Sequence, residues 1–415
     1  MEYNEIAVIR DIKYLNSQKH YIWTLIFLLA FNPIISFVNT VTNIFIYQGF
    51  TFDTIIVYLL LLVLISKSIF QLVSALNYNM LITILVTVSV FTFTFLFLPD
   101  NFRSAYTSFS DLSGNPLYYS LFAFIGYLIL TQISLIDLLV LNLIKTSKIL
   151  IPMSIINYIL LFNQGIIAEY MVISYDSLLF IAIALIGSLH FRDFKLGIIG
   201  IIGLLFIFFT GARGPIISLL LTFIFYFLFS NFSRSKKTLI LTILVLGIIV
   251  LWVNLDHTLS YLDNLFYNIG LQSRNLSLYF EDELTNDSGR AEIQNSLINK
   301  MTLFGHGIFG DRVVTGYAHN LFIEIFFQWG ILLGSVLSVI ILYIIYRGMK
   351  TNSNYLQFLI IVFLSTGFFK LQFSGSYLTE INFYLLIAFC QKAISFSKYN
   401  INFKTQPTRE SSLAN

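Results

Sequence analysis

Long apolar runs separated by short polar breaks recur along the whole 415-residue chain. Continuous runs of about 18 or more apolar residues are typical of transmembrane α-helices, whereas the strands of a membrane barrel alternate over shorter segments. The pattern therefore predicts an all-α fold, a polytopic transmembrane helical bundle of about 12 spans. The predicted spans are residues 21–38, 53–66, 79–98, 117–134, 149–163, 171–189, 196–210, 215–230, 238–254, 320–346, 355–371 and 380–396.

One long polar insert, residues 255–319, interrupts this pattern between the ninth and tenth spans. Inserts of this length are usually functional. The N-terminal segment is too polar to be a cleaved signal peptide, so the first span is expected to be its own insertion signal. The predicted parts are an N-terminal segment 1–20, spans 1–9 in 21–254, the insert 255–319, spans 10–12 in 320–396 and a polar tail 397–415.

The basic residues predict the orientation of the chain in the membrane. If the N-terminus lies inside and the spans alternate, 17 of the 24 Lys and Arg residues fall on the inner side and 7 on the outer side. Such an excess marks the cytoplasmic side of a membrane protein. Both termini are therefore predicted in the cytoplasm, and the insert becomes a large extracytoplasmic loop.

Composition agrees with the membrane class. The chain is 57% hydrophobic and 11% charged, whereas a soluble domain is about 25% charged. The single cysteine, Cys390, excludes an intrachain disulfide and a thiolate metal site.

The insert contains a predicted short helix, NDSGRAEIQNSLINKM, for which Asp287 or Ser288 is the expected N-cap. Arg290 falls in its first turn, where a cation opposes the helix dipole. We therefore expect Arg290 to face an anion. The predicted apolar stripe of this helix is Ile293, Leu297 and Met301.

After this helix comes LFGHGIFGD, a glycine-rich loop with His306 between two glycines. Its spacing matches neither a P-loop nor a dinucleotide fingerprint. His306 is expected either to shape this loop or to contact substrate.

The tenth span opens with polar residues that a span does not need. His319 and Asn320 occupy its predicted first turn, and Glu324 lies four residues after Asn320 on the same helical face. A carboxylate inside a span is costly and is a functional candidate. Glu324 is expected either to orient the site or to tie down the loop. Tyr317 precedes this group and is expected to line a sugar site or to be an interfacial aromatic residue.

Four segments occur in a fixed order on this frame: TGARGPIISLLL, DSGRAEIQ, LFGHGIFG and GYAHNLFIEIFFQWGILLG. In this order, over roughly residues 196–346, they resemble the bacterial O-antigen ligase and polymerase superfamily. Members of that superfamily move glycans from undecaprenyl diphosphate carriers on the outer face of the inner membrane. The resemblance therefore implies a multi-pass protein of the bacterial cytoplasmic membrane with an extracytoplasmic active site.

The resemblance also implies residue roles. Arg213 and Arg290 match arginines thought to hold the carrier diphosphate, and His319 matches the essential histidine that opens the helix after the large loop. These three are the predicted catalytic residues. The predicted substrate-binding residues are Asn320, Tyr317, Glu324 and His306.

The reaction suits these residue types. A lipid-linked sugar diphosphate is an activated donor, because its leaving group is a stable anion. Arginine binds phosphate oxygens in pairs and stays charged, and a histidine of ordinary pKa near 6.5 can take the acceptor proton. The insert has no Asp-x-Asp and no histidine cluster. We therefore expect a metal-independent transferase with no cofactor and no nucleic-acid partner.

Three functions remain open at this stage. The first is a polymerase that joins lipid-linked repeat units of O-antigen, capsule or exopolysaccharide, supplied by a flippase and limited by a chain-length regulator. The second is an O-antigen ligase that transfers finished glycan to lipid A-core. The third is a polysaccharide transporter or flippase, a class that usually shows mid-membrane charges and paired repeats. The short insert favours the polymerase.

Overall fold

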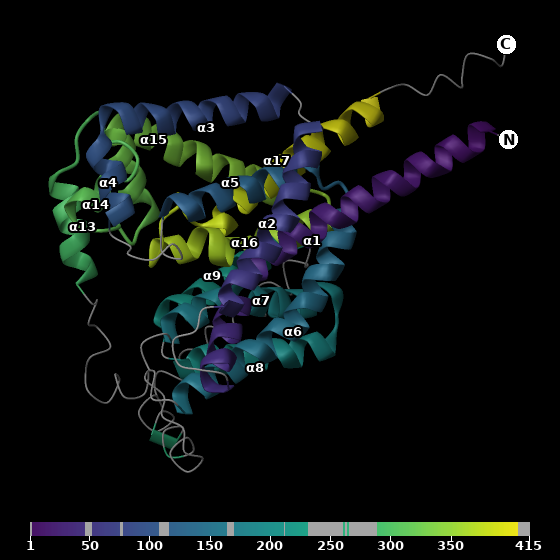
Figure 1. Ribbon diagram of the computed structural model, residues 1–415, viewed down its shortest axis with the longest axis horizontal. Helices are drawn as coiled ribbons and strands as arrows, with labels where there is room; N and C mark the ends of the chain where they lie inside the picture. Colours follow the sequence, from purple (N-terminus) through teal and green to yellow (C-terminus); the bar gives the residue numbers. More distant parts are fainter. Residues whose placement is uncertain are drawn as a thin grey trace.

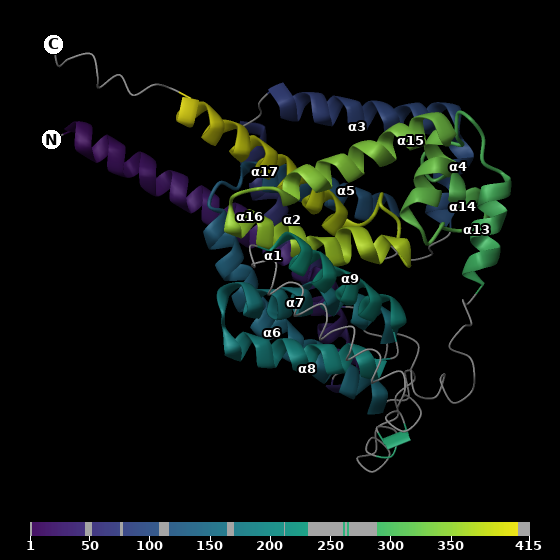
Figure 2. The same cartoon turned by 180° about the vertical axis from the view of Figure 1, so that it is seen from behind.

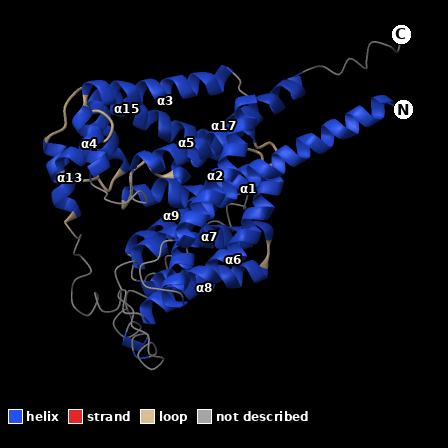
Figure 3. Cartoon of the chain, viewed as in Figure 1, coloured by secondary structure: helices blue, strands red, loops and turns tan. Residues whose placement is uncertain are grey.

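The computed structural model describes residues 2–45, 52–74, 78–107, 116–163, 170–210, 212–230, 260–261, 264 and 289–405. All regular structure in these ranges is helical (Figure 3), which confirms the predicted all-α class. The helices are α1 (Glu2–Phe45), α2 (Phe52–Ser74), α3 (Tyr78–Phe97), α4 (Pro99–Thr107), α5 (Pro116–Gln132), α6 (Ile136–Asn163), α7 (Tyr170–Phe191), α8 (Phe194–Thr210), α9 (Arg213–Phe229), α13 (Arg290–Asn299), α14 (Gly310–Val314), α15 (Leu321–Met349), α16 (Asn354–Leu364) and α17 (Ile381–Thr405).

Six helices of the described chain are long and apolar enough to cross a membrane, and five shorter apolar helices accompany them. Eleven of the twelve predicted spans fall on these helices. The remaining predicted span, 238–254, and most of the insert 255–319 lie outside the described residues. The count of twelve and the place of the large loop therefore stay predictions.

The centre of the bundle is built around α7. Residues 178–186 of this helix are almost completely buried, and α7 packs against α6 and α8 on one side and against α16 and α9 on another. Helix α3 runs along the edge of the molecule (Figure 1) and exposes most of its apolar side chains. A helix that is apolar all round and exposed suits contact with lipid.

The start of α6 differs from the prediction. The helix begins at Ile136 and not at residue 149, so the segment with Lys145 and Lys148 is helical. Lys148 reaches Asp193, which follows α7, with 3.3 Å between Nζ and Oδ2. Lys148 therefore has an acidic partner although it lies within the helix.

Helix α16 loses its regular form before it ends. A π-helical turn, η2 (Ser365–Phe369), follows it, and then a 3₁₀ turn, η3 (Lys370–Gln372). Such single π-turns occur often at functional sites. The change of form places Lys370 where the chain leaves the predicted eleventh span.

Helix α15 is also broken, at Gly330, whose φ is 78° and ψ is 167°. The glycine-rich loop pairs with the backbone at this break. His306 N donates to Phe327 O at 3.0 Å, Gly307 N to Gln328 O at 2.9 Å, and Ile331 N to Thr302 O at 3.0 Å. Gly330 therefore packs against this loop.

Gly330→Ala is expected to destabilise the protein by about 3 kcal/mol or more, because the new Cβ adds a collision to an unfavourable φ. That Cβ would lie 2.3 Å from Leu303 O. Gly316 is the matched control: its φ is 109° and a Cβ there meets nothing within 4 Å. Gly316→Ala should cost only about 1 kcal/mol. Denaturant unfolding of the two variants measures the difference, and equal losses would contradict the packing described.

The two ends of the described chain lie together. The first turns of α1 and the last turns of α17 project from one end of the molecule, and α13, α14 and α4 lie at the opposite end (Figures 1 and 2). This separation is what the predicted orientation requires. Which end faces the cytoplasm stays a prediction.

Candidate functional site

Helix α13 presents Arg290 at its first position. Gly289, with φ of 79°, is the N-cap residue and gives no side-chain cap. The helix itself confirms the prediction, and Asp287 and Ser288, the expected capping residues, lie outside the described residues. Arg290 therefore lies at the positive end of the helix dipole, where the side chain and the dipole both favour an anion.

The apolar stripe of α13 fixes this helix against α15. Leu297 is fully buried in a small cluster with Ala318 and Phe327, and Ile293 and Met301 pack against it. Ala318 directly precedes His319 in the chain. The packing therefore holds Arg290 and His319 in one region.

His319 is held in an unfavourable backbone conformation. Its φ of 53° lies in the left-handed region, which costs about 1–3 kcal/mol for a residue other than glycine. Its Nδ1 is buried with no hydrogen-bond partner among the residues that the structure describes. The ring of Tyr317 lies 3.9 Å from the imidazole, centroid to centroid. Costs of this kind are typical of functional positions.

The surroundings of His319 keep its imidazole neutral. Burial, and secondarily the nearby charge of Arg290, lower its pKa from 6.5 to about 4. From the sequence alone, the expected pKa of His319 is the ordinary value near 6.5. The neutral ring, which is the form that accepts a proton, is therefore present throughout the physiological pH range.

Asn320 is the N-cap of α15. Its Oδ1 accepts from Phe322 N at 3.0 Å and from Ile323 N at 3.2 Å. A polar residue opens this apolar helix because the first backbone N–H groups need acceptors. A contact of Asn320 with substrate stays a prediction.

The carboxylate of Glu324 is buried and turns away from Asn320, the partner expected from helical spacing. It accepts from Ser376 Oγ, from Tyr377 N at 3.2 Å and from Gln328 Nε2 at 3.2 Å. Gln328 Nε2 also donates to Asp311 Oδ1 at 2.8 Å. Glu324 therefore ties α14 and the segment before α17 to α15, which favours the loop-tying role over the orienting role.

Two aromatic residues extend this network. Tyr377 donates its hydroxyl proton to Gln328 Oε1 at 2.8 Å, and Trp329 Nε1 donates to the Tyr377 hydroxyl at 2.7 Å. Burial raises the pKa of Tyr377 well above its ordinary value and raises that of Asp311. A buried network of this kind is stable only while its members stay paired.

Glu324→Ala is expected to lower stability by about 2–4 kcal/mol, because Ser376 Oγ and Tyr377 N lose their acceptor inside the protein. Glu324→Gln keeps one acceptor oxygen and should lose less. Thermal unfolding measured by tryptophan fluorescence compares the two variants. Full stability of Glu324→Ala together with lost transfer would show instead that Glu324 acts in the chemistry.

Arg213 begins α9, as Arg290 begins α13. The next residue, Gly214, lies against the hydroxyl end of Tyr175: a Cβ on Gly214 would be 1.9 Å from the tyrosine hydroxyl. The charge of Arg290 also acts on Tyr175. Tyr175 therefore links the Arg213 segment to the region of Arg290 and His319.

His306 is engaged within its loop. Its Nε2 lies 2.7 Å from Lys300 O, and its ring stacks on Phe327 with centroids 4.4 Å apart. These contacts favour the loop-shaping role, and substrate contact stays a prediction. Arg312 is one of the seven basic residues predicted on the outer side. Its guanidinium lies 5.7 Å from the centroid of the Tyr317 ring.

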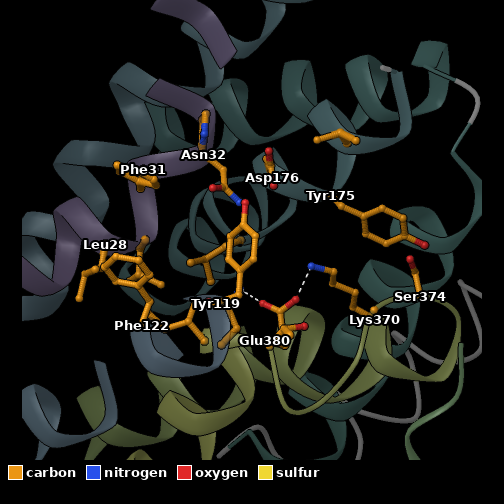
Figure 4. Close-up of a pocket in the computed structure, with 18 of the residues that line it drawn as sticks. Leu28, Phe31, Asn32, Tyr119, Phe122, Tyr175, Asp176, Lys370, Ser374 and Glu380 are labelled. Carbon is orange, nitrogen blue, oxygen red and sulfur yellow. Dashed lines mark hydrogen bonds and ion pairs between the residues drawn. The ribbon is translucent and has the colours of Figure 1, made fainter. Parts of the chain in front are cut away.

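Beside Tyr317 and Tyr175 opens a cavity of about 430 Å³, called here the polar cavity (Figure 4). It lies between α1, α5, α7 and the connection from α16 to α17. Its polar lining residues include Asn32, Tyr175, Asp176, Tyr317, Lys370 and Glu380. Of these, Tyr317 was a predicted substrate-binding residue. Asp176 and Lys370 are charged residues within predicted spans, which is itself a signal of function.

No described group of three or more His, Cys, Asp or Glu side chains has the arrangement of a metal site. Metal independence stays a prediction. Arg290 acts electrostatically on His319, and Arg312 lies beside the neighbouring Tyr317.

One family profile matches the chain, and its description is O-antigen ligase. Residues 198–337 match the O-antigen ligase family. The match confirms the resemblance to the O-antigen ligase and polymerase superfamily, whose members are glycosyltransferase-like enzymes. No curated protein and no solved structure matches the chain.

The O-antigen ligase segment, residues 198–337, contains every predicted site residue: Arg213, Arg290, His306, Tyr317, His319, Asn320 and Glu324. The polar cavity is different. Asn32, Asp176, Lys370 and Glu380 lie outside that segment, and Tyr317 lies inside it. The cavity therefore forms where the O-antigen ligase segment meets the rest of the bundle.

Proposed function

We propose that this protein is a membrane glycosyltransferase that polymerises lipid-linked oligosaccharide repeat units. The glycan would pass from undecaprenyl diphosphate to a hydroxyl of an acceptor sugar. The observation that carries the proposal is His319, held neutral and strained beside Tyr317 and within the field of Arg290, in a segment of the O-antigen ligase family.

Arg290 and Arg213 would bind the diphosphate. Each is the first residue of its helix, where the positive end of the helix dipole also favours an anion. A diphosphate there would be neutralised by two guanidinium groups without a metal ion. Charge that develops on the departing group would be stabilised in the same way.

The transfer step balances with these groups. The acceptor oxygen forms a bond to the anomeric carbon while the bond from that carbon to the diphosphate oxygen breaks. The leaving diphosphate takes the electron pair, and the imidazole of His319 takes the acceptor proton. A bound diphosphate also offsets the charge of Arg290, which raises the proton affinity of His319 when it is needed.

The test of this proposal is a glycan ladder. Lipid-linked repeat units collected from a strain that lacks this gene are supplied to the purified protein in liposomes. The proposal predicts a series of products that grow by one repeat unit. In the cell, a flippase would deliver the repeat units to this protein, and a chain-length regulator would set the final length of the glycan.

An O-antigen ligase is the second candidate, because the matching family carries that description. With lipid A-core present, a ligase would add one finished glycan and produce no ladder. The same reaction mixture therefore separates the two candidates.

The active site is proposed to face away from the cytoplasm, with both termini inside. Lys300, after α13, and Lys195, at the start of α8, are both exposed and lie on opposite predicted sides. The only native cysteine, Cys390, is buried. Lys300→Cys should react with a membrane-impermeant maleimide on intact cells, whereas Lys195→Cys should react only after permeabilisation. The reverse pattern would invert the orientation.

A further inference from the structure

The polar cavity contains three charged side chains within the bundle. Lys370 and Glu380 form an ion pair and are only 16% and 11% exposed. Asn382 Nδ2 donates to Glu380 Oε1 at 2.8 Å. In Figure 4 the ammonium of Lys370 points toward the carboxylate of Glu380, and Asn32 and Asp176 lie across the cavity from this pair. Ionisable groups in such a place are functional candidates.

The charge balance of the polar cavity argues against a phosphate ligand. Glu380 neutralises Lys370, and Asp176 adds a further carboxylate. No other charged residue lines this cavity in the described chain. A diphosphate would therefore be repelled here, while Arg213 and Arg290 offer it cations nearby. The ligand of the polar cavity must instead be uncharged or a hydrogen-bond donor.

The remaining lining fits a sugar ring. Tyr119, Tyr175 and Phe122 supply aromatic surface, and Asn32 supplies an amide. A sugar ring has an apolar face of C–H groups and a rim of hydroxyls, so aromatic rings and carboxylates suit its two kinds of surface. The volume of about 430 Å³ lies within the usual range of small-ligand sites, about 300–1,000 Å³.

The position of the polar cavity identifies which sugar it takes. Tyr317 lines it and also lies 3.9 Å from the ring of His319, centroid to centroid. His319 itself does not line the cavity, so a sugar there lies one side chain, Tyr317, away from the base that removes the acceptor proton. Tyr175 also lines the cavity, and its hydroxyl lies against Gly214 at the start of α9. The diphosphate and the sugar thus have separate, adjacent places.

We infer that the polar cavity binds the terminal sugar of the acceptor, with Asp176 and the Lys370–Glu380 pair accepting and donating hydrogen bonds to its hydroxyls. The inference rests on the proposed transferase function and adds the residues that select the acceptor. Because these residues lie outside the O-antigen ligase segment, acceptor choice would be encoded separately from diphosphate chemistry.

The test uses an acceptor that cannot act as a donor. Mild acid releases the oligosaccharide repeat unit from its diphosphate, and this freed oligosaccharide keeps the same terminal sugar. It is added to the ladder reaction, and its half-saturating concentration is read from its own extension or from its inhibition of the ladder. The KM of the lipid-linked donor is measured in parallel at a saturating concentration of the freed oligosaccharide, because lipid-linked units otherwise also fill the acceptor site.

Asp176→Asn is expected to raise the half-saturating concentration of the freed oligosaccharide by about 10- to 100-fold, the effect of losing one hydrogen bond to a charged group. The KM of the donor should change less than about twofold. Because a single change in the Lys370–Glu380 pair can unfold the protein, the paired variant Lys370→Gln/Glu380→Gln is used, with the same expectation. Asp193→Asn, at the other end of α7, is the matched control and should behave as wild type.

Each outcome decides a different point. A ladder from every variant with unchanged affinity for the freed oligosaccharide would overturn the inference and leave the transferase intact. A raised donor KM instead would assign the polar cavity to the donor sugar and also overturn it. No ladder from wild type would refute the proposed function, and this inference with it.

Discussion

His319→Ala is expected to lower the rate of glycan transfer by about 10²- to 10⁴-fold, the usual contribution of a general base. The protein should still fold, because the cluster that positions this segment consists of Leu297, Ala318 and Phe327. The loss should appear in kcat rather than in donor affinity, since the diphosphate is assigned to the arginines. Initial rates of the ladder reaction at saturating substrate measure it.

His319→Gly is the informative companion of this variant. Glycine adopts a φ of 53° without strain, whereas alanine does not. The glycine variant should therefore be more stable than the alanine variant by about 1 kcal/mol. Both variants should be equally inactive. Denaturant unfolding and transfer rates are measured on both. A glycine variant with wild-type turnover would show that the imidazole has no part in the reaction.

Arg290→Ala is expected to lower transfer by about 10²- to 10³-fold, as removal of one preorganised charge donor usually does. Arg290→Lys should recover only part of this loss, because an ammonium cannot donate two parallel hydrogen bonds to phosphate. Arg103→Ala is the matched control: it removes an exposed arginine of α4, paired at 3.7 Å with Asp100. Equal activity of Arg290→Ala and Arg103→Ala would remove Arg290 from the site.

The same substitution changes the pH response. The positive charge of Arg290 lowers the pKa of His319, so Arg290→Ala should raise it from about 4, while burial, the larger cause, still keeps it below 6.5. The acid limb of kcat/KM should move to higher pH, because the free enzyme then protonates sooner as the pH falls. Nitrogen-15 NMR of labelled histidine measures the pKa directly, and an unmoved pKa would contradict the electrostatic link.

The free energy of unfolding also depends on the protonation of His319. Since unfolded His319 titrates near 6.5 and folded His319 near 4, the unfolded state binds the proton first. His319 therefore contributes stability above about pH 6.5 that is lost as the pH falls towards 4. His319→Gly should lack this contribution.

Local patterns predicted the site residues that lie close together in the chain. The stripe of α13 and the polar start of α15 could be read from helical spacing, and the structure confirms both helices. Arg290 and His319 share a region because that stripe packs beside Ala318. Such contacts follow from amphipathic packing and short connections.

Contacts between residues far apart in the chain could not be predicted from the sequence. Glu324 finds Ser376 and Tyr377, more than fifty residues away, instead of Asn320 one turn before it. The polar cavity joins Asn32, Asp176 and Glu380 from three distant segments, and no local spacing marks that meeting. The break of α15 at Gly330 likewise depends on backbone pairing with the glycine-rich loop.

We propose that His319 and Arg290 together catalyse the transfer of glycan from a lipid diphosphate. The most direct measurement is the release of undecaprenyl diphosphate from lipid-linked repeat units by purified protein, counted against new glycosidic bonds. We predict that wild type releases one molecule of undecaprenyl diphosphate for each new glycosidic bond. The rate of release should be at least about 100-fold lower with the folded His319→Gly variant. Equal release by wild type and His319→Gly, or release without new glycosidic bonds, would contradict it.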